Sequence, residues 1–113
     1  MAADTYNLRL LSGSTNGKGI LVGNTVTTIH TAVSGTTLID VVQLWATNPT
    51  GGDILLTVNW GDTVGQTVQL IGFQKGDYLI ADKKPINNAQ IIQAVGAVSG
   101  VVIYGRVWRV TLG

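Results

Sequence analysis

The sequence predicts an all-β protein: a single domain over residues 1–113 that folds as an antiparallel β-sandwich or jelly roll of about eight or nine short strands. Val, Ile, Thr, Tyr and Trp, which favour strands, are spread along the whole chain. The absence of Glu and of any long run of Ala, Leu and Lys disfavours helices. Turn-forming residues, among them 15 glycines, interrupt the apolar stretches about every 8 to 12 residues, as they do in sandwiches and barrels.

The expected strands follow one another with short breaks. Alternation of residue types is clearest in residues 53–60, where one face carries Ile54, Leu56, Val58 and Trp60. We expect that face to point into the core. In chain order, the nine candidate strands are residues 5–11, 19–22, 25–33, 37–46, 53–60, 66–71, 77–81, 89–96 and 101–112.

Three segments fit this pattern less well. Residues 1–4 are expected to be flexible, and the Gly, Ser, Thr and Asn tract at residues 12–19 is expected to be the flexible loop of a long hairpin. Residues 85–95 have an apolar spacing that a helix could also use. The pair Asn87-Asn88 is a poor helix interior, so a strand, or a turn followed by a strand, is favoured there.

The composition predicts that part of the surface is covered by another subunit. Only 12% of the residues are charged, against about 25% in typical domains, and 45% are hydrophobic. The candidate strands at residues 37–46 and 101–112 carry apolar side chains on both faces, although a small antiparallel sandwich buries only one face of each sheet. The candidate interface residues on or near these strands are Trp45, Tyr104, Arg106, Trp108 and Arg109.

Charge and hydropathy argue against two classes of partner. The formal net charge is +1, with no basic cluster of the kind that binds nucleic acid or an anionic membrane. No run approaches the ~18 apolar residues of a membrane-spanning helix, and the N-terminus lacks the basic stretch of a secretory signal. We therefore expect no nucleic acid partner and no membrane partner.

Residues for catalysis are scarce, and we expect no enzyme, no catalytic residues, no metal and no cofactor. The chain has no cysteine and one histidine, His30, which excludes thiolate sites and His-pair metal sites. No Gly-x-Ser-x-Gly nucleophile motif occurs. The tract at residues 13–19 superficially suggests a phosphate-binding loop, but Ser12 and Gly19 stand where that motif needs Gly and Ser or Thr.

Asp40 and His30 are candidates for a buried polar pair. Strand geometry places the Asp40 carboxylate on an apolar face, where an unpaired charge would be costly. A cation or a hydrogen-bond donor is therefore required, and the available groups are His30, Arg106 and Arg109. A structural pair within the chain is favoured over an active-site acid.

The aromatic residues leave a second interpretation open. Aromatic side chains on strands are usually core or interface anchors, but a flat group of them can also stack on sugars. The six candidates for such a platform in a carbohydrate-binding sandwich are Trp45, Trp60, Trp108, Tyr6, Tyr78 and Tyr104.

Five short segments between about residues 28 and 110 are informative when taken together. They are Ile29-His30-Thr31-Ala32, residues 35–42 (GTTLIDVV), Ala46-Thr47-Asn48, Val58-Asn59-Trp60-Gly61 and residues 103–110 (IYGRVWRV). In these segments the chain resembles small virion structural proteins of tailed bacteriophages, and most of all capsid cement, or decoration, proteins.

The resemblance implies a structural module that binds the major capsid protein on the outer face of a phage head, commonly as a homotrimer, and stabilises the shell. Such a protein would be made in the host cytoplasm and would end on the capsid surface of the virion. The alternative is a carbohydrate-binding or fibre- or tail-associated β-sandwich module.

Overall fold

The computed structural model describes residues 6–61, 63–72 and 77–111, and within them it contains nine strands in two antiparallel sheets. Sheet A has the order β1-β9-β4-β7, with β2 also paired to β9, and sheet B has the order β3-β8-β5-β6. The predicted all-β fold class is confirmed. The strands are β1 (Tyr6–Arg9), β2 (Ile20–Val22), β3 (Thr27–Thr31), β4 (Leu38–Thr47), β5 (Ile54–Trp60), β6 (Thr63–Leu70), β7 (Tyr78–Ile86), β8 (Ile91–Gly96) and β9 (Val101–Thr111).

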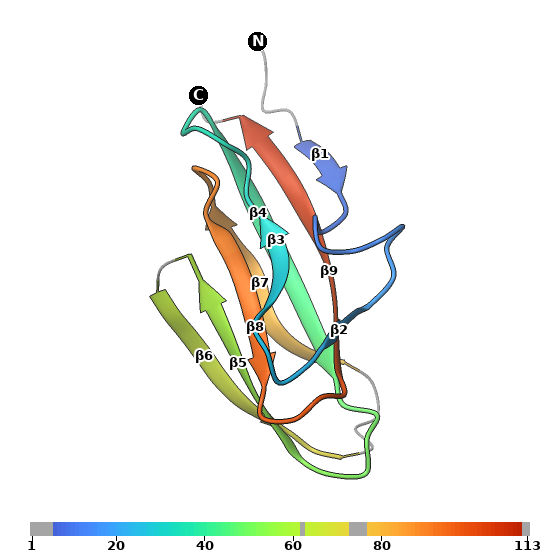
Figure 1. Cartoon of the computed structure of the whole chain (residues 1–113). Coiled ribbons are helices and arrows are strands. Elements are labelled where there is room, and N and C mark those ends of the chain that lie inside the picture. Colours follow the sequence, from blue (N-terminus) through green and yellow to red (C-terminus); the bar gives the residue numbers. More distant parts are fainter. Residues whose placement is uncertain (1–5, 62, 73–76, 112–113) are drawn as a thin grey trace.

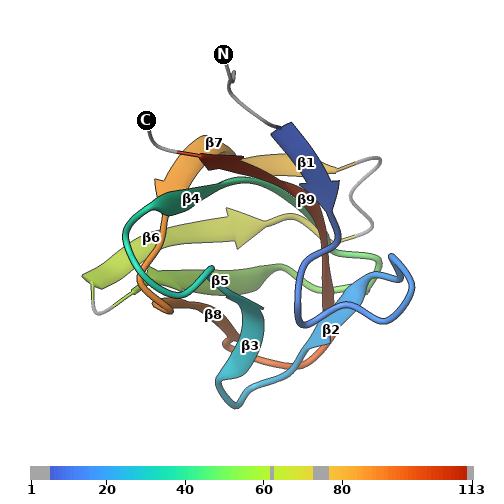
Figure 2. The same ribbon diagram turned by 90° about the horizontal axis from the view of Figure 1, so that it is seen from above.

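The two sheets pack face to face as two layers (Figures 1 and 2). From β2 onward the chain changes sheet at every connection except the hairpin that joins β5 to β6. This strand order is that of a jelly roll, the second form of the predicted fold. The described residues contain no helix, and hence no helix that is long and apolar enough to span a membrane.

The core lies between the layers and is built by the alternate, inward-pointing side chains of β4, β5 and β9. Ile54, Leu56 and Val58 are at most 3% exposed, which confirms the face predicted for them. Trp60, at the end of the same face, is partly buried and packs against the core cluster. The longest strand, β9, pairs with β4 over ten residues, so these two strands form the centre of sheet A.

The expected hairpin at residues 12–19 does not form. β1 and β2 pair with β9 and not with each other: Leu8 is opposite Trp108, while Leu21 is opposite Val102. The reason is length, because the eleven residues of β9 can accommodate a four-residue and a three-residue strand one after the other along the same edge. Residues 1–4, which we expected to be flexible, lie outside the described residues.

β7 is longer than predicted and includes a proline. The candidate strand at residues 77–81 extends to Ile86, and Pro85 is tolerated because β7 is an edge strand, where one side of the backbone needs no ladder partner. Asn88 and Ala89 then adopt positive φ angles, which ends the strand in a turn before β8. The strand-and-turn interpretation of residues 85–95 is therefore confirmed over the helical one.

Candidate functional site

The outer face of sheet A is the main candidate site, because apolar side chains cover most of it. On β4 and β9 one set of alternate side chains is buried in the core, and the other set points outward and stays partly exposed. Neighbouring strands extend this face with leucines that are 44–67% exposed. The outer face of sheet A comprises Leu8, Leu21, Ile39, Val41, Gln43, Trp45, Leu79, Val102, Tyr104, Arg106, Trp108 and Val110.

Arg106 lies at the centre of this face between two tryptophans. Its guanidinium carbon is 4.9 Å from the ring centroid of Trp45 and 5.7 Å from that of Trp108. Cation–π contacts of this kind are each worth about 0.5–1 kcal/mol at exposed sites. Within the part of the chain that the structure describes, no side chain accepts a hydrogen bond from this guanidinium. Arg106 is thus exposed and held by the two aromatic rings.

A shallow depression of about 290 Å³ lies beside Trp108 on the same face. Val41, Trp108 and Val110 supply its apolar wall, and Lys83 contributes a cation. Lys83 has a φ of 57° at a point where β7 and β4 shift register. Sequence reasoning missed Lys83, because a left-handed bulge inside a strand has no simple residue pattern when the residue is not glycine.

The sequence-predicted interface residues separate into two groups. Trp45, Tyr104, Arg106 and Trp108 all lie on the outer face of sheet A, with Trp45 directly opposite Tyr104 in the β4–β9 register. Arg109 instead points to the inner side of β9, where it contacts Asp40. The alternation of side chains along β9 could have separated them, because residues 104, 106 and 108 point to one face of the strand and residue 109 points to the other.

The buried polar site joins both sheets. Asp40 on β4 and His30 on β3 are 0% and 2% exposed, and His30 Nε2 lies 2.8 Å from Asp40 Oδ2. On the other side of the carboxylate, Arg109 donates from Nε to Oδ1 at 2.8 Å and from Nη2 to Oδ2 at 3.2 Å. The backbone N–H of Val33 donates to Oδ2 at 3.0 Å. Asp40 thus accepts four hydrogen bonds from three elements of the fold.

A bulge in β3 turns His30 inward. The sequence alternation would place His30 on the same face as Thr28, but the register of β3 against β8 shifts between these two residues. Ile29 and His30 are therefore both buried, while Thr28 is exposed. The bulge is therefore what turns the imidazole of His30 into the core.

The hydrogen bonds of His30 fix its tautomer. The backbone N–H of Ser12 donates to Nδ1 at 3.0 Å, so this nitrogen acts as an acceptor. Nε2 must then carry the proton that is donated to Asp40. The imidazole thereby links the loop after β1 to the centre of the buried site, a connection that the sequence did not indicate because it uses a backbone group.

The carboxyl of Asp40 is held in its ionised form. Burial by itself would raise the pKa, but the hydrogen bonds from Arg109, His30 and the Val33 N–H outweigh it and lower the pKa below its ordinary value. The same contact with Asp40 raises the pKa of Arg109. The arrangement is that of a structural ion pair, with both Oδ atoms already occupied by donors.

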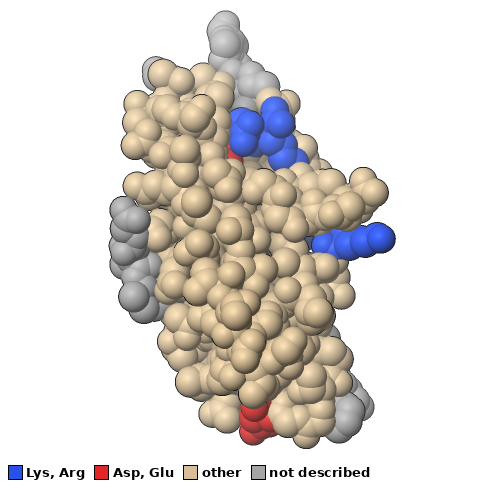
Figure 3. All heavy atoms as spheres, viewed as in Figure 1, with Lys and Arg blue, Asp and Glu red and all other residues tan. Residues whose placement is uncertain are grey.

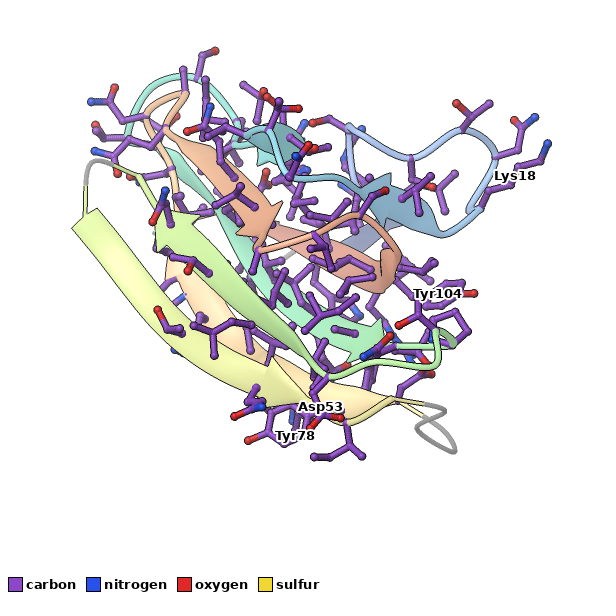
Figure 4. The ribbon with its side chains drawn as sticks, turned by 60° about the horizontal axis from the view of Figure 1, so that its bottom comes forward. Lys18, Asp53, Tyr78 and Tyr104 are labelled. Carbon is purple, nitrogen blue, oxygen red and sulfur yellow. The ribbon has the colours of Figure 1, made fainter. Side chains whose placement is uncertain are left out.

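A metal site and a sugar-binding platform would each need several side chains close together. Among them no group of three or more His, Asp or Glu side chains is close enough together to hold a metal ion. The six aromatic residues considered as a sugar platform do not form one surface. Trp60 packs at the side of the core and donates its indole N–H to the carbonyl of Pro85 at 3.2 Å, and in Figure 4 Tyr78 and Tyr104 point in different directions. The side chain of Tyr6 lies outside the described residues.

Comparison with known proteins identifies the fold and no family. No family model matches the chain, and no curated protein matches it. One similar solved structure is a chain of the Bacillus endospore appendages, described as a novel family of disulfide-linked pili. It matches with a TM-score of 0.56 and 10% sequence identity, over 97% of this chain and 89% of that chain. At this identity the likeness shows a shared fold.

Proposed function

We propose that this protein is a non-enzymatic structural subunit that binds other protein subunits through the outer face of sheet A. The observation that carries the proposal is the nature of that face: exposed leucines and aromatic rings surround Arg106, which is held by two tryptophans. Contiguous exposed apolar patches are typical of protein interaction sites, and Trp, Tyr and Arg are the residues most often found at their energetic centres.

In its specific form, the proposal is a capsid cement protein. The partner is the major capsid protein on the outer face of a phage head, where the protein sits as a homotrimer and stabilises the shell. The resemblance of the sequence to decoration proteins supports this form. The fold shared with a chain of the Bacillus appendages supports a structural role more generally, although the disulfide links of those pili have no counterpart in a chain without cysteine.

The carbohydrate-binding alternative has less support from the tryptophans. Arg106 lies over the rings of Trp45 and Trp108, and the Lys84 ammonium lies 6.0 Å from the ring centroid of Trp60. A sugar ring that stacks on these residues would have to use the remaining ring faces, of which Trp60 has few because it packs against the core.

Binding to capsid shells tests the proposal with a matched pair of variants. Leu79 and Leu55 are 44% and 47% exposed and lie on the outer faces of sheets A and B. We expect Leu79→Lys to lower the occupancy of shells built from the virus's own major capsid protein at least tenfold, whereas Leu55→Lys leaves it unchanged. Because the contact is apolar, occupancy should survive a rise from ~0.1 to ~1 M salt, over which the Debye length falls from ~10 to ~3 Å.

The cement role adds a second readout. Shells that carry the protein should rupture at a higher temperature than bare shells, because a ligand of the assembled state stabilises that state. Equal rupture temperatures at full occupancy would contradict the cement role. A protein that ignores shells but binds glycans, with the binding lost in aromatic variants, would support the carbohydrate-binding alternative.

A further inference from the structure

The two sheets do not close into a barrel, so each has edge strands whose backbone groups face outward. The edges are β7 and the β1/β2 side in sheet A, and β3 and β6 in sheet B. An exposed edge is a template for pairing with another strand, and proteins usually guard it with charges, proline, bulges, shortness or a covering loop. The four edges of this protein differ sharply in how well they are guarded.

β7 is guarded along its second half. Residues 82–85 are Asp, Lys, Lys and Pro, all exposed. Pro85 has no N–H to donate, and Lys83 adopts a φ of 57° at a bulge that bends the strand. An incoming strand would meet three charges and a missing donor.

β3 and the β1/β2 edge are guarded by shortness and by the loop after β1. β3 has five residues and a bulge, and the loop covers its free side: the Gly13 N–H donates to the Ile29 carbonyl at 3.0 Å, and the Thr31 N–H donates to Ser12 Oγ at 2.6 Å. β1 and β2 have four and three residues with a loop between them. None of these edges offers a long, uninterrupted row of backbone groups.

β6 is the exception. Its eight residues, Thr63–Leu70 with the sequence TVGQTVQL, include no charge and no proline. It ends the order of sheet B, and Figure 1 draws it at the margin of the molecule with no strand beyond it. The outer face beside it is also uncharged: Thr57, Asn59, Thr67 and Gln69 lie there, and the middle of the face in Figure 3 shows neither blue nor red.

We propose that β6 pairs antiparallel with β6 of a second copy of this chain, so that two sheets B become one continuous eight-stranded sheet. A second copy is the fitting occupant because the edge is self-complementary, with no charge on either strand to repel its copy. The other edges of a second copy are the guarded ones, which leaves β6 as its matching surface. The two-fold symmetry of such a contact closes the pair, so the contact joins two single copies, or two of the proposed trimers, and does not continue as a fibre.

The pairing brings Thr67 close to its own copy. Thr67 is next to the middle of the strand, and side chains opposite each other in an antiparallel pair have Cβ atoms about 4.5–5.5 Å apart, or about 7–8 Å on the diagonal. Thr57, its neighbour on β5, lies one strand further in on each side. Three strand spacings then separate Thr57 from its copy, which amounts to roughly 14 Å.

Cysteine substitution tests this geometry directly, because the chain has no cysteine of its own. The two hydroxyls of Thr57 and Thr67 are 3.3 Å apart, so Thr67→Cys and Thr57→Cys disturb the same contact and are matched variants of the full chain. Under mild oxidation at low micromolar concentration we expect Thr67→Cys to form a covalent dimer in high yield and Thr57→Cys to stay monomeric in a denaturing gel.

A charge pair gives the second measurement. Thr67→Lys places like charges near each other across the two-fold axis and should halve the particle mass in sedimentation, whereas Thr57→Lys should keep the mass of the wild type. A cross-linking yield no greater for Thr67→Cys than for Thr57→Cys, or an equal mass for Thr67→Lys and the wild type, would overturn the proposal. Both readouts are independent of shell binding through sheet A, which Leu79→Lys reports.

Discussion

Replacing Asp40 by Asn should be among the most destabilising conservative changes in the chain. Asp40 is fully buried and accepts four hydrogen bonds, two of them from Arg109. An Asn side chain keeps the shape but offers one acceptor oxygen, and its amide group would face the donors of Arg109 or His30. The Arg109 charge would lose its partner.

The magnitude follows from the burial of the partners. Removing one member of a buried ion pair costs about 3–5 kcal/mol, but the Arg109 side chain is 23% exposed and can recover part of its hydration, so we expect about 2–4 kcal/mol. Urea unfolding at fixed protein concentration measures this as a shift of the midpoint at constant slope. Asp82→Asn is the control, because Asp82 is exposed and bonds one Gln43 amide; its change should stay within about 0.5 kcal/mol.

The pH dependence provides the decisive signature. The folded-state pKa of Asp40 lies below its unfolded value, so its contribution to stability is present above about pH 4 and is lost as the pH falls through the folded-state pKa. The stability gap between the wild type and Asp40→Asn should therefore be constant near neutral pH and shrink below pH ~4. The assignment of Asp40 as a buried, ionised partner of Arg109 would be refuted by either of two results. One is a loss of stability in Asp40→Asn no larger than that in Asp82→Asn, and the other is a loss that does not shrink in acid.

Two further predictions concern packing. Leu56→Ala should lower the free energy of unfolding in urea by about 2–5 kcal/mol, because it leaves a cavity in the core. Leu55→Ala, at a neighbouring residue that is 47% exposed, should lower it by less than about 1 kcal/mol. Similar losses for the two variants would show that the inner face of β5 is misassigned. Gly105→Ala should lower the melting temperature clearly more than Gly52→Ala. A Cβ at Gly105 would lie 2.5 Å from the backbone oxygen of Gln43, whereas a Cβ at Gly52 would have no described heavy atom within 4 Å except those of its chain neighbours. A melting temperature for Gly105→Ala equal to that of Gly52→Ala would mean that β9 and β4 separate more easily than their close approach implies.

Local patterns were sufficient to predict the strands and the core face of β5, because alternation and turn residues act over a few positions. The requirement that Asp40 have a partner also followed from the sequence, since a carboxylate among Leu38 and Val42 needs one. The choice among His30, Arg106 and Arg109 did not follow, because it depends on the β4–β9 register and on a bulge in β3. These are long-range pairings that no single strand encodes.

The same limit applies to the outer face of sheet A. Trp45, Tyr104 and Trp108 were found because two strands were apolar on both sides, a signal contained within each strand. Leu8, Leu21 and Leu79 were missed, because they join the face only through their pairing with β9 and β4. A short strand such as β1 gives no indication of which face it shares until its neighbour is known.

The position of β9 has a consequence for how the chain folds. β9 is the last strand in the sequence, yet it is the partner of β1, β2 and β4. Until it has been synthesised, β1 and β2 have no strand to pair with, and the inner edge of β4 stays open. Sheet A therefore forms late and through contacts between distant parts of the chain, which is typical of slow folding. During that interval the apolar residues of β4, Trp45 among them, are exposed to neighbouring chains, so aggregation competes with completion of the fold.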